Sequence, residues 1–298
     1  MRFPKSTVSF CAGRLRSAQP SVDVAACNQN RHGPPGRVLR FLRLSCLLLG
    51  VMALSLLAAE PGMVFIPGGE FLRGRSHPLP DDGLKWQPTL LKDDRPAKRI
   101  HVDPFYLDEH EVTNEAYLRF LEATGRERPF HWLDGELPAG GEKHPVVNVN
   151  WFEATAYCES LGKRLPTEAE WERAARGMAE GAKFPWGEEE PDKGVQAHFN
   201  VLDGPRPVCR FPRNTFGLCD MAGNVWEWCF DRYDRLYYER SPGKNPRGPD
   251  EGMYRMLRGG SWADVAKYLT CAYRSYARPR EQSPNIGFRC ARSFPPSR

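Results

Sequence analysis

The sequence predicts an α+β fold, as one irregular and loop-rich domain. The chain of 298 residues is 41% hydrophobic, which is enough to bury a sizeable core. Its 27 glycines and 27 prolines favour turns and loops over a helical bundle. Strand-like and helical segments alternate up to Gly177, and beyond it the apolar runs are short and broken by Pro, Gly, Asn and Asp. Much of the backbone is therefore expected to be irregular.

Strands are expected near the start of this domain. Residues 62–75 hold two apolar runs separated by Pro67-Gly68-Gly69, a pattern that predicts a β-hairpin. Residues 101–107 show a further strand pattern. Residues 76–97 between them are polar and rich in Pro and Asp, which predicts a long surface loop.

Three helices are predicted from the residues that would cap their N-termini. Thr113 caps the first, and Asn150 and Thr167 each precede a glutamate by three residues, which forms a capping box. Gly162 and Gly177 end the second and third helices. Helical periodicity places these residues on the buried faces: Ala116, Tyr117, Phe120, Leu121, Ala154, Tyr157, Cys158, Leu161, Trp171, Ala174 and Ala175.

The N-terminal segment is expected to direct export. Residues 37–59 combine three arginines with an apolar run of about 16 residues that ends on small side chains, which is typical of a signal peptide. We expect cleavage near Ala59 and a periplasmic or extracellular protein, with an uncleaved membrane anchor as the alternative. We expect residues 1–36 to be a disordered or over-extended N-terminus, because they show no periodicity.

The charge balance argues against nucleic acid as a partner. Eight of the 42 Lys and Arg residues, but one of the 37 Asp and Glu residues, lie within residues 1–59. The remaining chain is therefore near neutral, at about −2, and its cations are not gathered in a stripe. We also expect no membrane contact beyond the leader.

Six cysteines follow the leader, and an even number in an exported domain favours disulfides. They are Cys158, Cys209, Cys219, Cys229, Cys271 and Cys290. Spacing alone does not choose the pairing. No two of them form a Cys-x-x-Cys motif, which disfavours a zinc ribbon or a thioredoxin-type site.

Four motifs, in this order, closely resemble the formylglycine-generating enzyme (sulfatase-modifying factor) family. The motifs are Met63-Val-Phe-Ile-Pro-Gly-Gly-Glu-Phe71, Gly162-Lys-Arg-Leu-Pro-Thr-Glu-Ala-Glu-Trp-Glu172, Gly217-Leu-Cys-Asp-Met-Ala-Gly-Asn-Val-Trp-Glu-Trp228, and Arg258-Gly-Gly-Ser-Trp262 with Asn285-Ile-Gly-Phe-Arg-Cys290. The resemblance covers roughly residues 62–293. It implies a single domain related to C-type-lectin-like folds, with a protein or peptide as substrate or partner.

The third motif is a candidate cation site. Asp220 and Glu227 flank a glycine-containing turn and offer oxygens suited to Ca²⁺, although a glutamate–arginine ion pair is the simpler interpretation of the residues alone. The family resemblance implies structural calcium held by four positions, and it implies a second site further upstream. The first set is Asp220, Gly223, Val225 and Glu227, and the second is Asn200 and Val201, with Asp203 as a substitute ligand.

The copper site of the family is expected to be absent. Authentic members hold copper(I) with two cysteines, three and eight residues after the serine of the fourth motif, because copper(I) prefers soft thiolates. The corresponding residues here are Asp264 and Leu269. Copper is therefore an unexpected cofactor, whereas Asp264 offers a harder ligand for iron. The histidines are scattered along the sequence, and a nonheme-iron site formed by some of them is an alternative.

The resemblance also implies a disulfide between Cys158 and Cys290. Cys271 matches a second family disulfide whose partner position is Ala175 here, so we expect Cys271 to pair with Cys229 or Cys209, or else to remain free.

Two functions follow from these patterns. The first is an oxygen-dependent oxidoreductase of altered chemistry, or an accessory maturation factor, with a site around Ser261, Trp262, Asp264 and Arg274. The second is a calcium-braced binding module without catalysis. Authentic formylglycine generation is a further alternative, less favoured than an altered or accessory function.

Overall fold

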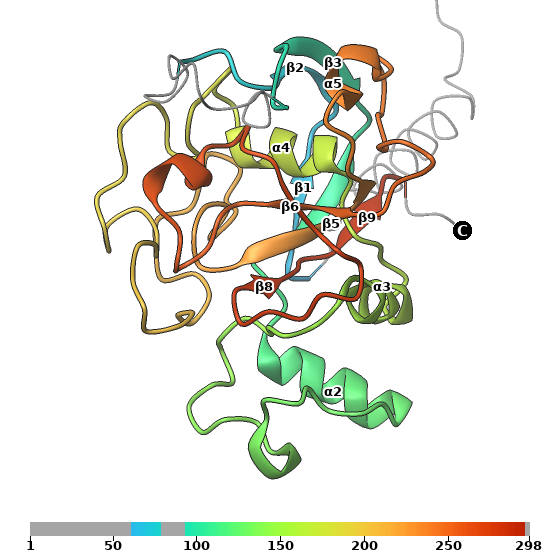
Figure 1. The fold of residues 1–298 in the computed structure, drawn as a ribbon, viewed down its shortest axis with the longest axis vertical. Coiled ribbons are helices and arrows are strands. Elements are labelled where there is room, and N and C mark those ends of the chain that lie inside the picture. Colours follow the sequence, from blue (N-terminus) through green and yellow to red (C-terminus); the bar gives the residue numbers. More distant parts are fainter. Residues whose placement is uncertain (1–60, 79–92, 296–298) are drawn as a thin grey trace, which may run out of the picture. The chain divides into compact units, whose positions relative to one another are not determined.

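The computed structural model describes residues 61–78 and 93–295, and the helices and strands are arranged as in Figure 1. The expected signal peptide and N-terminal tail lie outside this range. The strands are β1 (Met63–Ile66), β2 (Gly69–Arg73), β3 (Lys98–Val102), β4 (Phe105–Asp108), β5 (Trp226–Arg232), β6 (Arg255–Arg258), β7 (Ser275–Ala277), β8 (Ile286–Gly287) and β9 (Ala291–Ser293). The helices are α2 (Asn114–Thr124), α3 (Trp151–Ser160), α4 (Glu168–Arg176) and the one-turn α5 (Tyr237–Arg240), with 3₁₀ turns η2 (Leu133–Gly135) and η3 (Ala266–Leu269). Within the described residues, no helix is long and apolar enough to cross a bilayer.

The predicted hairpin at residues 62–75 is wrong, because β1 and β2 belong to different sheets. β1 pairs antiparallel with β4, and β2 pairs antiparallel with β3. The break falls at Gly68, where an added Cβ would lie 2.7 Å from Cδ of Pro104. The chain therefore turns from one sheet into the next at this close approach, and a side chain at position 68 would prevent it.

The two larger sheets hold all the strands except β2 and β3. One has the order β1-β4-β9, and the other has the order β7-β6-β5-β8, in which β5 and β8 are parallel. α4 packs against β2, β3, β5 and β6 near the middle of the domain, whereas α2 lies at one end of it (Figure 1). The predicted α+β, loop-rich architecture is confirmed.

The predicted helix starts are confirmed. The side chain of Thr113 accepts a hydrogen bond from the Ala116 amide, and Asn150 and Thr167 form complete capping boxes. The buried faces agree with the periodicity except at Ala116, which is partly buried, and at Leu161, which is 45% exposed. Leu161 is the C-cap of α3, so the helical spacing no longer applies to it.

Two disulfides and two free thiols account for the six cysteines of the domain. The bond between Cys158 and Cys290, which the resemblance implied, ties α3 to the chain just before β9. A second bond joins Cys209 to Cys219. Cys229 and Cys271 are free and fully buried. The expected disulfide of Cys271 is therefore wrong, and the alternative of a free thiol holds.

Candidate functional site

The fourth motif forms a loop after β6 that backbone hydrogen bonds hold in place. Gly259 and Gly260 both adopt positive φ angles, of 99° and 75°, which turn the chain away from the sheet. The amide of Asn200 donates to the carbonyl of Asp264 at 2.8 Å, and that of Val201 donates to the carbonyl of Trp262 at 2.9 Å. The backbone of residues 200 and 201 therefore holds this loop in position.

The structure brings together three of the four predicted catalytic residues. The hydroxyl of Ser261, which is fully buried, donates to Oδ2 of Asp264 and accepts from Nδ2 of Asn285 at 3.2 Å. Trp262 lies between them in sequence, half-buried. Burial raises the pKa of Asp264, and hydrogen bonds from Ser261 and Trp226 oppose that shift. The result is a hydroxyl–carboxyl pair that can hold or pass a proton.

The fourth predicted residue, Arg274, lies elsewhere. Its guanidinium is fully buried and binds Glu168 through Nε at 2.7 Å and Nη2 at 3.1 Å. Glu168 and Glu172 lie on one face of α4 and also pair with Arg258. Arg274 is thus part of a buried ion-pair network in the core, and its predicted place beside Ser261 is wrong.

Three clefts surround the loop. The Trp226 cleft, of about 460 Å³, is lined by Trp226, Tyr254, Leu257, Ser275, Tyr276, Ala277, Arg278, Glu281, Ser283, Asn285 and Ile286. The Trp262 cleft, also about 460 Å³, is lined by Asn114, His131, Pro138, Ala139, Gly140, Gly141, His144, Pro145, Val147, Asn148, Gly204, Pro205, Trp262 and Pro284. The basic cleft, of about 650 Å³, is lined by His144, Lys193, Gly194, His198, Val201, Asp203, Arg206, Pro207, Arg210 and Phe211. The Ser261–Asp264 loop therefore adjoins space that a ligand could fill.

The two free thiols, Cys229 and Cys271, are not reactive groups of this site. Burial raises the pKa of Cys271 to about 12, and it also raises the pKa of Cys229 well above its usual value. Both thiols are therefore protonated at neutral pH, and both are enclosed in the same apolar cluster. A buried, protonated thiol is a poor nucleophile and a poor metal ligand.

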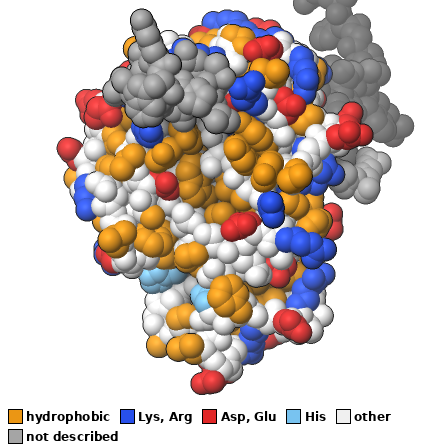
Figure 2. Space-filling model, in the orientation of Figure 1, with side chains coloured by type: hydrophobic (Ala, Val, Ile, Leu, Met, Phe, Trp, Pro, Cys, Tyr) orange, Lys and Arg blue, Asp and Glu red, His pale blue; other side chains and the backbone are white. Residues whose placement is uncertain are grey.

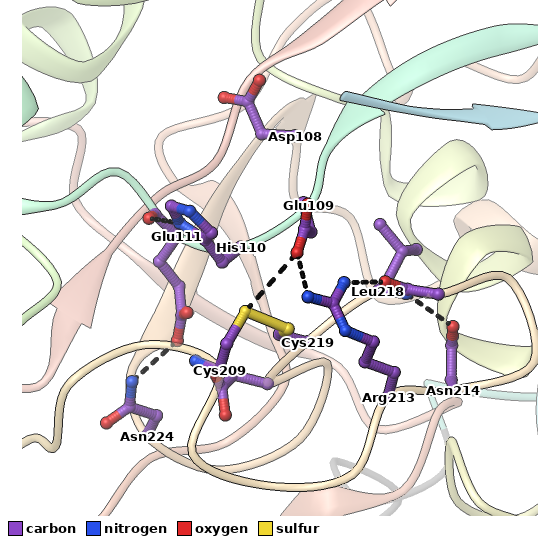
Figure 3. Close-up of a disulfide and its surroundings, with 12 residues drawn as sticks. Asp108, Glu109, His110, Glu111, Cys209, Arg213, Asn214, Leu218, Cys219 and Asn224 are labelled. Atoms are coloured by element: carbon purple, nitrogen blue, oxygen red, sulfur yellow. Dashed lines mark hydrogen bonds and ion pairs between the residues drawn. A yellow bond between two sulfur atoms is a disulfide. The ribbon is translucent and has the colours of Figure 1, made fainter. Parts of the chain in front are cut away.

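The third motif places carboxylates around a left-handed turn. Glu111, Asp220 and Glu227 interact with one another and with the guanidinium of Arg289, which donates to both oxygens of Glu227 at 2.7 and 2.8 Å. Oε1 of Glu111 accepts from Asn224, whereas its Oε2 is buried without a partner among the described residues (Figure 3). Three carboxyl groups thus share one guanidinium, so the cluster would carry an excess of negative charge if all three were ionised.

That excess is the feature a hard cation would neutralise. Burial and the neighbouring Asp220 carboxylate raise the pKa of Glu111 well above its usual range. Burial likewise raises the pKa of Asp220, whose Oδ2 accepts from the Cys209 amide at 2.6 Å. Sequence patterns had singled out Asp220 and Glu227 but did not connect them with Glu111, which precedes them by more than 100 residues.

The predicted ion pair of Glu227 with an arginine is also present, and it competes with the cation interpretation. Oε2 of Glu227 accepts from Nε1 of Trp171 at 2.8 Å and from Arg289. Glu227 therefore already has protein partners, and the unpartnered oxygen in the cluster is that of Glu111.

The Cys209–Cys219 disulfide closes a short loop directly before Asp220. Glu109 lies against this bond and pairs with Arg213, and Asn214 accepts from the amide of Leu218 at 3.1 Å (Figure 3). Glu109 and the two sulfurs lie close enough to hold a metal, but both sulfurs are consumed by the disulfide. The disulfide, with Glu109 and Arg213, therefore fixes the backbone just before the Asp220 turn.

The second predicted cation site has weaker support. Asn200 is exposed, and Asn200 and Val201 use their backbone amides to brace the loop described above. Asp203, the expected substitute ligand, forms an ion pair with Arg206 and lies 3.4 Å from Nε2 of His198. Its carboxylate is therefore engaged by neighbouring side chains.

Motif order, the irregular α+β fold and the glycine-turned serine loop define a domain of the formylglycine-generating enzyme type. The family model described as "Sulfatase-modifying factor enzyme 1-like domain" matches residues 53–294, and the chain belongs to this family. The Streptomyces coelicolor formylglycine-generating enzyme is 35% identical, over 78% of this chain and 91% of that protein. A mouse protein named "Inactive C-alpha-formylglycine-generating enzyme 2" is 33% identical, over 79% and 87% respectively.

Other relatives share only part of their length with this chain. The Chlamydia caviae protein named serine/threonine-protein kinase pkn1 is 42% identical over 77% of this chain, but the chain covers 38% of that protein.

Among solved structures, Treponema denticola variable protein 1 superimposes with a TM-score of 0.64 at 26% identity, over 77% of this chain and 94% of that one. PvdO from Pseudomonas aeruginosa gives 0.63 at 27% identity, over 77% and 93%.

Proposed function

We propose that this protein is an exported family member that binds a protein or peptide, as an accessory or maturation factor or an oxidoreductase of altered chemistry, without copper-dependent formylglycine generation. The observation that carries this proposal is the identity of the loop residues. Asp264 and Leu269 stand where authentic members have copper-binding cysteines, and Leu269 is fully buried.

The chemistry of the remaining groups supports the proposal. Copper(I) prefers soft thiolates, whereas the carboxylate of Asp264 is a hard ligand. The free thiols of the described residues, Cys229 and Cys271, are buried and protonated. The mouse relative whose name calls it inactive is compatible with a family fold that persists without the activity.

A binding role is supported by the space around the loop. The Trp226 and Trp262 clefts both contain residues that lie at the loop or contact it, namely Trp226, Asn285 and Trp262. A polypeptide segment could occupy either cleft. The family resemblance to enzymes that modify sulfatases makes a polypeptide the natural class of partner.

The test is oxidation of a sulfatase-type peptide. Purified protein would be loaded with copper(I), mixed with a Cys-x-Pro-x-Arg peptide, and followed by oxygen consumption and by the mass of the peptide. We expect no oxygen uptake, no mass change and no tight copper binding. Copper-dependent oxidation of the peptide cysteine, lost in Cys271→Ser, would refute the proposal. Metal analysis of the same preparation distinguishes an iron enzyme from a calcium-braced binding module.

Structural calcium and export are further parts of the proposal. Asp220, the Gly223 and Val225 carbonyls and a carboxylate of the cluster supply the hard oxygens that Ca²⁺ prefers. Bound calcium would neutralise buried negative charge and brace the turn. Export is supported by the leader in residues 37–59 and by the two disulfides, which persist in oxidising compartments.

A further inference from the structure

The Trp262 cleft and the basic cleft share a wall. His144 lines both clefts, and the consecutive residues 203–207 contribute alternately to each. Gly204 and Pro205 face the Trp262 cleft, whereas Asp203, Arg206 and Pro207 face the basic cleft. The two clefts are therefore adjoining parts of one groove.

The two parts differ in charge. The Trp262 cleft holds prolines, Val147 and Trp262, and its two histidines are neutral at pH 7, because burial lowers the pKa of His131 and of His144, and Arg206 lowers the latter further. This part therefore carries no formal charge and suits an apolar side chain.

The basic cleft holds more cations than the protein itself neutralises. Asp203 pairs with Arg206. Lys193 and Arg210 are exposed and have no side-chain hydrogen bond or ion pair within the described part of the chain. This part of the groove therefore carries about two uncompensated positive charges, which favour an anionic ligand. Arginine in particular binds carboxylates through two parallel hydrogen bonds.

Exposed apolar side chains stand beside the groove in sequence. Phe130 and Leu133 flank His131 and Trp132 and are 72% and 82% exposed, and Leu202, next to Asp203, is 92% exposed. Figure 2 shows histidine side chains at the surface next to hydrophobic ones. These side chains do not line the clefts themselves, but they add exposed apolar surface of the kind that protein partners cover.

Both walls of the groove are fixed by one buried residue. The Arg206 amide donates to Oδ1 of Asn224, and the Trp262 amide donates to the carbonyl of Asn224, each at 2.9 Å. Asn224 is 1% exposed. The groove is therefore largely pre-formed, which lowers the entropy that binding must overcome.

We infer that this groove binds a peptide segment in which an apolar residue is next to two acidic residues. The apolar side chain enters the Trp262 cleft, and the carboxylates meet Lys193, Arg206 and Arg210 in the basic cleft. The inference rests on the proposed function and specifies its ligand. It differs from the arginine-containing peptide of authentic family members, because the groove is positive.

The test uses labelled octapeptides and fluorescence anisotropy with the full mature protein. The first peptide carries a Glu-Glu-Phe core, the second Gln-Gln-Phe, the third Glu-Glu-Ser, and the fourth is the sulfatase-type Cys-x-Pro-x-Arg peptide. We expect the first to bind at least about tenfold more tightly than each of the others, since both a charge-assisted contact and an apolar contact are needed. Added salt should weaken its binding.

Variants locate the binding site. Arg210→Gln and Lys193→Gln should each weaken binding of the Glu-Glu-Phe peptide about three- to tenfold, without loss of folding, because neither side chain has a described partner. Arg240→Gln is the matched control, since Arg240 is exposed and lines neither cleft, and it should leave binding unchanged.

Equal binding of the Glu-Glu-Phe and Gln-Gln-Phe peptides would overturn the inference, as would unchanged binding in both groove variants or tighter binding of the Cys-x-Pro-x-Arg peptide. Absence of any binding by the Glu-Glu-Phe peptide would also overturn it. If that occurs while copper and oxygen remain unused, the proposed function stands and only its ligand is wrong. Peptide oxidation with copper would instead refute the proposed function.

Discussion

Nδ2 of Asn224 donates to Oε1 of Glu111 at 3.0 Å, in the buried interior between the carboxylate cluster and the groove. The same side chain accepts from the Arg206 amide through Oδ1. Asn224 adopts a φ of 56°, a left-handed conformation that asparagine tolerates better than most residues. One residue thus links the candidate cation site to both walls of the groove, so a change at one site can affect the other.

Replacement of Asn224 should be strongly destabilising. Asn224→Ala removes a buried and a part-buried hydrogen bond and takes their partner from Oε1 of Glu111 and from the Arg206 amide, so we expect a loss of about 2–4 kcal/mol in the free energy of unfolding. Urea denaturation measures it. Asn200→Ala is the matched control, because Asn200 also has a positive φ, of 52°, but is exposed and has no side-chain hydrogen bond within the described residues. A similar loss in both variants would show that backbone conformation alone matters at position 224.

Features set by neighbouring residues were predictable from the sequence, and those set by distant contacts were not. The helix starts at Asn150 and Thr167 depend on residues three positions away, so the capping boxes predicted them. The pairing of β1 with β4 depends on the close approach of Gly68 to Pro104, which local turn signals do not reveal. The hairpin prediction failed for that reason.

The candidate site shows the same division. The loop around Ser261 and Asp264 was predictable because Asp264 follows the motif that contains Ser261 by only two residues. Arg274 was misplaced because its partner, Glu168, lies 106 residues earlier and is turned into the core. Glu111 was not connected with the cluster for the corresponding reason, since its neighbours there come from a distant segment of the chain.

The position of Arg274 predicts a role in stability. Arg274→Met would leave Glu168 buried with less compensating charge, and removing one partner of a buried pair costs about 3–5 kcal/mol. Arg274→Lys should cost less, because it keeps the charge but loses the paired hydrogen bonds. The control is Arg119→Met at the exposed pair with Glu115, where about 0.5 kcal/mol or less is expected. Chemical denaturation of the three variants gives the comparison, and equal losses would contradict a buried network.

Asp231 predicts a measurable pH dependence of stability. Burial, with the nearby Glu168 carboxylate, raises the pKa of Asp231 to about 8 in the folded protein. The folded state therefore holds a proton that the unfolded state releases near pH 4, so this residue makes stability fall as pH rises from about 4 to 8. The contribution is at most about 1.4 kcal/mol per pH unit.

Asp231→Asn should remove that contribution while keeping an acceptor for the Glu168 amide, which donates to Oδ2 of Asp231 at 2.8 Å. Denaturation at several pH values should show the difference in stability between variant and wild type growing in favour of the variant between pH 5 and 8. A constant difference across that range would mean that Asp231 stays ionised in the folded protein.

Calcium is expected to stabilise the native state through the carboxylate cluster, because a ligand that binds only the folded protein shifts the unfolding equilibrium. At calcium about 100-fold above its Kd the gain is about 2.7 kcal/mol, which raises the Tm by about 5–10 °C for a domain of this size. Glu111→Gln keeps the acceptor for Asn224 but removes a negative charge, so the calcium-induced rise in Tm should shrink. Asp203→Asn should retain the full rise, since Asp203 is paired with Arg206 outside the cluster. Calorimetry with calcium and with EDTA separates these cases: an unchanged Tm in the wild type would exclude a calcium site, and a loss in Asp203→Asn alone would place it at the Asn200 segment instead.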